Sequence, residues 1–166
     1  MNNEQAFTNL VRRQRSTIYT VCYMFSNDQD EVNDLFQEVL IRLWQGWETF
    51  RGDADERSWV YRVALNTCIS IDRSKKAKRH QPIMDGVNLF DDSDVKNHQT
   101  ELLHQRIMRL QPFDRAIVLL WLEDLSYEEI GAIVGITAKN VSVRLVRIRE
   151  QLKKEPPSPS TGSGQA

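Results

Sequence analysis

The feature that most constrains this chain is the stretch from residue 125 to residue 154, near its end, in which apolar residues recur at helical spacing. Its second part places apolar residues at i, i+4, i+7 and i+11, the spacing of one buried helical stripe. These residues are Val141, Leu145, Ile148 and Leu152. Just before them, Gly135 accepts the left-handed conformation that ends a helix, and Thr137 can cap the next one. The pattern predicts a helix, a glycine turn and a second helix.

The helix before the turn carries its own start signal. Ser126 is followed three residues later by Glu129, the pattern of a capping box in which each side chain bonds the other residue's backbone N–H. Ile130, Ile133 and Val134 then recur at helical spacing. The first helix is therefore expected to begin after Ser126 and to end before the glycine.

A helix, a glycine turn and a second helix form the helix-turn-helix, in which the second helix enters the major groove of DNA. A helical hairpin with a solvated basic face would have the same caps and periodicity, and charge separates the two readings. From Thr137 to Lys154 there is a single acid, Glu150, against these bases: Lys139, Arg144, Arg147, Arg149, Lys153 and Lys154. Because a helix that is only solvated usually mixes both signs, the charge favours DNA binding.

Composition sets the outer bounds. The chain has 166 residues, 40% of them hydrophobic, and a formal net charge of −1, which allows one domain or two small ones. Its two cysteines, Cys22 and Cys68, fall on apolar helical faces and are expected to be buried thiols in a reducing compartment. The first fifteen residues lack a signal-peptide hydrophobic region, and no apolar run approaches membrane-spanning length. We therefore expect a cytoplasmic location and no membrane insertion.

Three further helices are predicted in the first half of the chain, over Asn3–Phe25, Asp30–Trp47 and Ser58–Lys75. Acids crowd the start of the second helix: Asp28, Asp30, Glu31, Asp34 and Glu38. The helix macrodipole accounts for part of this cluster. Asp34, Gln37 and Glu38 also share a face that points away from the core, which indicates a surface for a basic partner.

The third of these helices has two faces. Its core side carries Val60, Val63, Ala64, Thr67 and Ile71, and its opposite side carries Trp59, Arg62, Asn66, Ser70 and Arg73. On that opposite side an aromatic could stack on a base, an amide could recognise a base edge, and arginines could hold phosphates. Packing at the edge of the core is an equal alternative for the tryptophan. The helix continues into a basic run that is typical of phosphate binding: Arg73, Lys75, Lys76, Lys78 and Arg79.

The remaining stretches set the domain limits. Residues 80–100 mix a proline, a glycine and acids and are expected to form a flexible linker, followed by short helices over Glu101–Arg109 and Pro112–Glu123. We predict an all-α protein of two small helical domains: 1–77, an acidic linker 78–99, 100–154 with the helix-turn-helix, and a disordered tail 155–166. His80, His98 and His104 lie at no metal-ligand spacing, and no catalytic motif stands out, so no metal, cofactor or enzyme activity is expected.

These residues resemble the extracytoplasmic-function sigma factors, the small two-domain members of the bacterial sigma-70 family. Asp34–Trp44 looks like region 2.2, Phe50–Asp72 looks like regions 2.3 and 2.4, and Leu110–Leu152 looks like region 4. The three stretches occur in the family's order and spacing. The resemblance implies a protein that binds core RNA polymerase, at its β′ clamp and β flap, and directs it to promoter DNA.

The resemblance also implies a role for each surface. Docking on the polymerase falls to Asp34, Leu35, Gln37, Glu38 and Ile41. Recognition and opening of the minus-10 element, with a flipped base, falls to Phe50, Arg51, Trp59, Arg62, Asn66, Arg73, Lys75 and Lys76. Recognition of the minus-35 element falls to Thr137, Lys139, Asn140, Val143, Arg144 and Arg147.

Two further points follow from the resemblance. Members of the family are commonly held inactive by an anti-sigma factor, so such a partner is expected. Val143 and Ile148 stand where small residues are common in the family, and Val143 either touches a thymine methyl group or only alters packing. The alternative to a sigma factor is a helix-turn-helix regulator that acts without polymerase, which would leave the acidic face and the acidic linker without a purpose.

Overall fold

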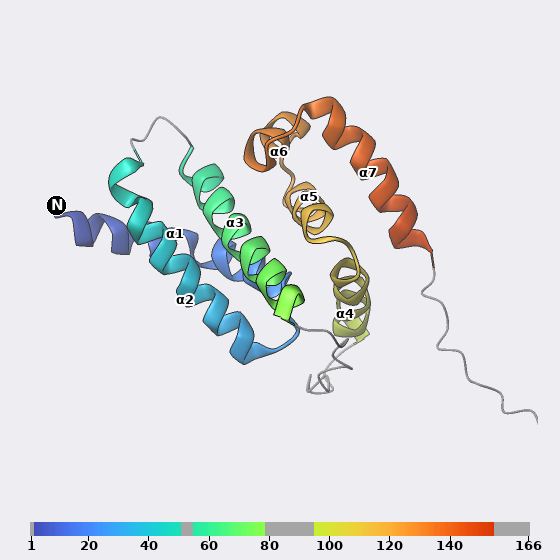
Figure 1. The fold of residues 1–166 in the computed structure, drawn as a ribbon, viewed down its shortest axis with the longest axis horizontal. Coiled ribbons are helices and arrows are strands. Elements are labelled where there is room, and N and C mark those ends of the chain that lie inside the picture. Colours follow the sequence, from blue (N-terminus) through green and yellow to red (C-terminus); the bar gives the residue numbers. More distant parts are fainter. Residues whose placement is uncertain (1, 51–54, 79–94, 155–166) are drawn as a thin grey trace, which may run out of the picture.

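The computed structural model describes residues 2–50, 55–78 and 95–154, and within these ranges every regular element is a helix. The elements are α1 (Asn3–Tyr23), α2 (Gln29–Gly46), the 3-10 turn η1 (Trp47–Thr49), α3 (Glu56–Lys78), α4 (Val95–Met108), α5 (Pro112–Leu122), α6 (Tyr127–Val134) and α7 (Ala138–Lys153). The all-α prediction is confirmed. Figure 1 shows an N-terminal half, α1–α3, beside a C-terminal half, α4–α7, with α3 against α5 and α6.

The predicted start and stop signals are all used. Ser126 and Glu129 form both bonds of the capping box before α6. Gly135 follows α6 with a φ of +86°, the left-handed region that favours glycine. Thr137 then accepts a bond from the backbone N–H of Asn140 at 3.1 Å, which caps α7. The helix-turn-helix is therefore built from local signals that stand in the sequence.

The boundary that differs most from the prediction is the start of α4; the ends of α1, α2 and α3 differ by one to three residues. Helix α4 begins at Val95, well before the predicted Glu101, so residues 95–99 are helical where a linker was expected. No proline or glycine lies between Val95 and Met108 to stop the helix from extending toward its N-terminus. The rest of the predicted linker, residues 79–94, lies outside the described residues, as do the loop 51–54 and the tail 155–166.

The two halves share one hydrophobic core. Leu10, Ile18 and Leu43 from one half and Ile117 and Ile130 from the other are fully buried members of the same cluster. Complete burial of such a side chain contributes about 1.5–3 kcal/mol, so a common core makes the halves stabilise one another.

Helix α3 supplies the central part of that core. Besides its predicted core side, it buries Tyr61, Leu65 and Cys68 on a second flank, and α3 packs against α5 and α6. Cys22 and Cys68 are free, buried thiols, as predicted. The hydrogen bond with Cys22 and burial together raise the pKa of Cys68, so this thiol stays protonated and acts as apolar packing.

A buried polar contact between the halves lies at the end of α1. This helix has no base in its last turn, so its final carbonyl groups carry the negative end of the macrodipole without a cation of their own. The Nε2–H of His104 donates to the Tyr23 carbonyl at 2.8 Å, and its ring stacks on the Tyr23 ring with centroids 4.2 Å apart. His104 is only 4% exposed. Because the carbonyl can only accept, this nitrogen must carry the proton.

Arg115 of α5 completes the same junction. Its guanidinium donates to the Met24 carbonyl at 3.5 Å and to the carbonyl groups of Met108 and Leu110 at 3.0 and 3.1 Å. It also lies over the Phe25 ring, 5.0 Å from the centroid, and is 3% exposed. One buried side chain therefore caps the ends of α1 and α4 together.

Three outer contacts accompany this junction. Arg62 donates to the Ala132 carbonyl of α6 at 2.9 Å. Glu123 accepts from Arg57 and from the Tyr61 hydroxyl, each at 3.4 Å. The first two turns of helix α3 are thus bonded to the C-terminal half.

We predict that protonation of His104 destabilises the protein. Burial, with the positive charge of Arg115, lowers the pKa of His104 below its ordinary value of 6.5. As the pH falls through that ordinary value, His104 binds a proton in the unfolded chain but remains neutral in the folded protein. The free energy of unfolding therefore falls. Urea unfolding between pH 7.5 and 5.5 should show this loss, with a slope no steeper than about 1.4 kcal/mol per pH unit for one proton.

His104→Gln is the matched control, because its amide can still donate to Tyr23 but does not titrate. All other titrating groups are common to both proteins and cancel in the difference. If the variant lost stability with pH as steeply as the parent, His104 would not be the source.

Candidate functional site

The recognition helix α7 buries one stripe and leaves the opposite side open. Val141, Leu145 and Ile148 are buried at 0%, 2% and 1% exposure. Of the residues predicted to contact the minus-35 element, those that are exposed along this helix are Lys139, Asn140, Val143, Arg144 and Arg147. The sixth predicted residue, Thr137, is exposed at the N-terminal end of α7, where its hydroxyl oxygen caps the helix.

Arg144 is held by α5. Its Nη1 lies 3.0 Å from Oδ1 of Asp114, and its guanidinium lies over the Phe113 ring, 4.7 Å from the centroid. Arg149 lies over the Trp121 ring in a similar way, at 5.6 Å. These two arginines therefore lie along the edges of the exposed side of α7, each in contact with α5. The sequence pattern alone had predicted them on the exposed side itself.

Val146 was missed by the sequence reasoning. It is 61% exposed, and its neighbour Val143 is 47% exposed. The signal was present in the register, since Val146 lies three residues from Val143 and off the buried stripe.

Helix α3 presents the predicted second face. Arg62, Asn66, Ser70 and Arg73 are exposed along it, and Trp59 at its start is half-buried. Arg62 is engaged by the Ala132 carbonyl, as described above. The amide and Arg73 stand on open surface beside it.

An aromatic cluster lies at the N-terminal end of this face. The rings of Phe50 and Trp59 are stacked with centroids 4.6 Å apart, and Trp47 lies 6.0 and 6.3 Å from them. Trp59 packs closely enough on α2 that a Cβ added to Gly46 would meet its ring at 3.4 Å. The edge-of-core packing weighed for Trp59 is therefore real, and Phe50 and Trp59 are both partly exposed. Arg51 lies outside the described residues.

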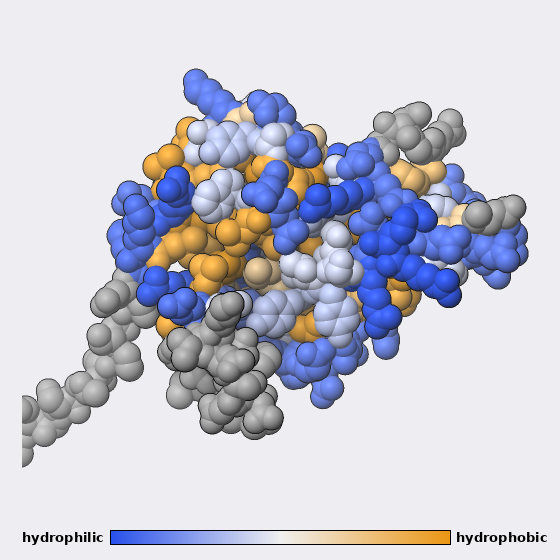
Figure 2. Space-filling model, turned by 180° about the vertical axis from the view of Figure 1, so that it is seen from behind, coloured by the Kyte–Doolittle hydropathy of each residue, from blue (hydrophilic) through white to orange (hydrophobic). Residues whose placement is uncertain are grey.

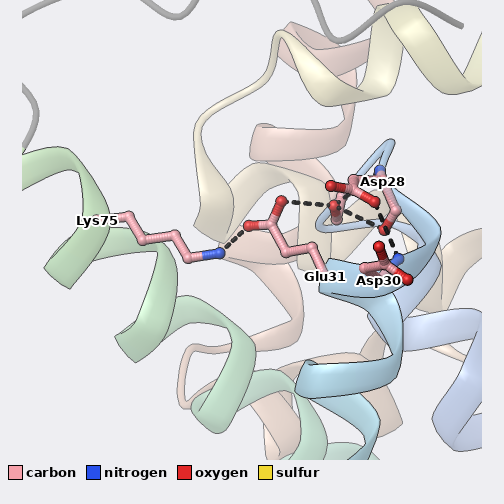
Figure 3. A network of polar contacts seen from close by, with 5 residues as sticks. Asp28, Asp30, Glu31 and Lys75 are labelled. Carbon is pink, nitrogen blue, oxygen red and sulfur yellow. Dashed lines mark hydrogen bonds and ion pairs between the residues drawn. The ribbon is translucent and has the colours of Figure 1, made fainter.

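The basic run at the end of α3 is partly neutralised by acids of the same half. Figure 3 shows Lys75 reaching from α3 to Glu31 of α2, with which it forms an ion pair. Glu31 also accepts from the Ser26 hydroxyl at 2.9 Å, and Asp28 caps α2 through the Asp30 N–H at 2.9 Å. The structure thus brings Lys75 to the α2 side and not to the face of Arg62 and Asn66.

Lys76 remains largely outside. Its Nζ lies 3.5 Å from Oδ2 of Asp72, one turn earlier, and its side chain is 62% exposed. An exposed i, i+4 pair of this kind contributes only about 0.3–0.5 kcal/mol, so Lys76 can leave Asp72 for a phosphate at small cost.

The exposed face of α2 contains most of the predicted polymerase-binding residues. Asp34, Gln37 and Ile41 are exposed, and Glu38 pairs with Arg42 at 3.4 Å. Leu35 is a correction: at 4% exposure it belongs to the core beneath this face, because its position in the helix turns it toward the other helices.

Trp44 is a large apolar side chain of the same helix that is not buried. It is 44% exposed and contacts Phe7 edge-on at 5.0 Å. It lies three residues beyond Ile41, which is 50% exposed. The face therefore combines acids with two large apolar side chains.

Other kinds of site find little support. Among the described residues there is no group of three or more His, Cys, Asp or Glu side chains arranged to hold a metal ion. None of the helices in that part of the chain has the length and apolar content needed to cross a membrane.

Comparison with known families agrees with this arrangement. The sequence pattern of "Sigma-70 region 2" matches residues 10–79, which contain α2 and α3. The pattern of "Sigma-70, region 4" matches residues 100–152, which contain the helix-turn-helix. The chain therefore belongs to the sigma-70 family, and its nearest group within that family follows from the relatives.

The relatives carry the name of one subfamily. The ECF RNA polymerase sigma factor SigW of Bacillus subtilis is 30% identical over 169 residues, covering 92% of this chain and 90% of SigW. The ECF RNA polymerase sigma factor SigE of Mycolicibacterium smegmatis is 30% identical over 152 residues, covering 87% of this chain and 59% of SigE. This protein is an extracytoplasmic-function sigma factor, a class of non-catalytic transcription initiation factors.

Solved structures share the fold. CnrH, in complex with the cytosolic domain of CnrY, superposes with a TM-score of 0.67 at 21% identity, covering 91% of this chain and 87% of CnrH. The sigma factor RpoE of Bartonella quintana, in complex with the anti-sigma factor NepR, superposes with a TM-score of 0.69 at 17% identity, covering 89% of this chain and 94% of that one.

Proposed function

We propose that this sigma factor docks on core RNA polymerase through the exposed face of α2, opens the minus-10 element on α3 and recognises the minus-35 element with α7. The observation that carries the proposal is the pairing of two sigma-70 matches with two exposed basic helices, one in each half. A helix-turn-helix regulator without polymerase binding is not favoured, because it has no use for a region 2 match.

The polymerase face has the composition of a protein interface. Asp34 and Glu38 provide negative charge for a basic partner, and Ile41 and Trp44 provide apolar area at its side. Exposed aromatic side chains are frequent sites of strong binding energy, and complementary charge raises the rate and specificity of encounter. Trp44 thus adds to the set that the resemblance supplied.

The minus-10 face is suited to a single strand. The stacked pair of Phe50 and Trp59 offers an aromatic surface for an unpaired base, and Asn66 can recognise a base edge. Arg73 and Lys76 stand further along the helix, where they can hold the phosphates.

The two DNA-binding faces cannot serve one straight promoter while the halves remain packed. A compact chain of this length has a radius of gyration of about 15 Å and is roughly 40 Å across. Two elements about 25 base pairs apart are separated by roughly 85 Å of duplex at 3.4 Å per step. Helix α3 touches α6 directly, so binding both elements requires the halves to separate and Arg62 to leave Ala132.

An anti-sigma factor is a suitable additional partner. Leu102 and Leu103 of α4 and Leu122 of α5 are each 42% exposed. Figure 2 shows hydrophobic side chains gathered on the half of the molecule built from α4–α7. An exposed apolar area of this kind is typical of a protein-binding surface, and both solved relatives named above are bound to a partner protein.

Run-off transcription tests the function directly. Core polymerase with this protein should give new, specific transcripts from a library of genomic promoter fragments, and polymerase alone should give none of them. Polymerase binding without any transcript would contradict independent promoter recognition. Absence of both binding and transcripts would support the regulator.

We predict that Asp34→Asn with Glu38→Gln weakens binding to core polymerase roughly tenfold, about 1.4 kcal/mol, because the basic partner loses two charges. Titration of labelled protein with core polymerase measures the affinity. Glu4→Gln with Glu128→Gln is the control, since it removes two exposed acids from other surfaces. Equal affinity of both double variants would place the docking surface elsewhere.

We predict that the halves separate on a promoter. Fluorescent dyes attached at Ser16→Cys in α1 and Gln151→Cys in α7, both exposed positions, report the distance, and the buried native cysteines remain unlabelled. Energy transfer should be high in the free protein and should fall when polymerase and a promoter with both elements are added. Unchanged transfer in a transcribing complex would contradict separation.

A further inference from the structure

The exposed side of α7 has an apolar centre. Val146 and Val143 are 61% and 47% exposed, while the buried stripe of the same helix is at most 2% exposed. At three residues apart they are neighbours on the helix surface, with Cβ atoms about 5–6 Å apart. Valine is also a poorer helix former than the leucine, lysine or arginine found nearby. Folding alone gives no reason for two valines there.

Charges surround these valines without covering them. Lys139 lies one turn before Val143 and Arg147 one turn after it, and both are exposed. Arg144, the residue next to Val143, is drawn to Asp114 and Phe113, and Arg149 is drawn to Trp121. The exposed side of the helix is therefore apolar in the middle, with Lys139 and Arg147 one turn to either side of Val143 and a single acid, Glu150, one turn after Val146.

This arrangement fits the floor of the DNA major groove. Phosphates line the two edges of the groove, and the side chains of Lys139 and Arg147 can bind them. The one apolar group that the nucleobases present in the groove is the C5-methyl group of thymine. Two residues three positions apart differ by about 4.5 Å along the helix, close to the 3.4 Å step between base pairs.

We propose that Val143 and Val146 recognise thymine methyl groups at adjacent base pairs of the minus-35 element, and that Asp114 holds Arg144 aside from them. This inference rests on the proposed function, since it takes α7 as the minus-35 reader. It assigns part of the sequence specificity of α7 to apolar contacts, in addition to the contacts expected from its lysine and arginine side chains.

The experiment uses the complex of this protein with core polymerase and a promoter found by run-off transcription. Each thymine of the minus-35 element, on either strand, is replaced by deoxyuridine, which removes one methyl group and leaves every hydrogen-bonding group in place. At one or two positions we expect a roughly fourfold loss of promoter affinity, which corresponds to about 0.8 kcal/mol for one buried methyl group. Deoxyuridine outside the element should have no effect.

Variants assign the loss to residues. With Val143→Ser and Val146→Ser, thymine and deoxyuridine promoters should be bound equally, because serine has a similar helix propensity but offers no comparable apolar contact. Gln151→Ser, an exposed change on the same helix, should retain the fourfold difference.

The outcomes separate this inference from the function. Equal binding of thymine and deoxyuridine promoters by the parent protein would overturn methyl recognition while transcription continued. A deoxyuridine effect that persisted in both serine variants would overturn the assignment to these valines. Loss of all promoter-specific transcription would instead overturn the proposed function, and the inference with it.

Discussion

The arrangement of this protein depends on the unpaired carbonyl groups at the end of α1. That helix ends without a base of its own, and buried carbonyl groups without partners are costly. His104 and Arg115 supply the donors, and both belong to the C-terminal half. Because Arg115 also bonds the Met108 carbonyl at the end of α4, one side chain completes a helix end in each half. The shared core and the packing of α3 against α5 and α6 lie beside this junction and hold the same two halves together.

Local signals explain how much of the fold the sequence could predict. The capping box, the left-handed glycine and the threonine cap act within a few residues, so the helix-turn-helix could be placed closely. The burial of Tyr61 and Leu65 on α3 could not, because it depends on helices from the other half. Periodicity identifies a face as apolar or polar, but it does not say which other element will cover it.

The same limit applies to the candidate site. Exposed faces on α2, α3 and α7 follow from helical register, and they were predicted. The partners of individual basic side chains were not predicted, because they are distant in the sequence. Arg144 binds Asp114, Lys75 binds Glu31, and Arg62 donates to the Ala132 carbonyl. These pairs narrow the positive surface that the basic runs alone would indicate. They also leave two valines as the most prominent feature of the recognition helix.

The polar contacts at the junction differ in strength, and this has a consequence for opening. Arg57 and Glu123 are 47% and 37% exposed in their side chains, and such a pair contributes at most about 1 kcal/mol. His104 and Arg115 are buried, so their bonds, with the covered flank of α3, must supply most of the stability of the closed arrangement. Turning a population from 99% closed to 99% open requires a partner that favours the open form by about 5.5 kcal/mol. In the proposed function, core polymerase and promoter DNA both favour the open form, so together they supply this energy. The closed arrangement then couples promoter recognition to polymerase binding, because the separation that one partner brings about is no longer a cost to the other.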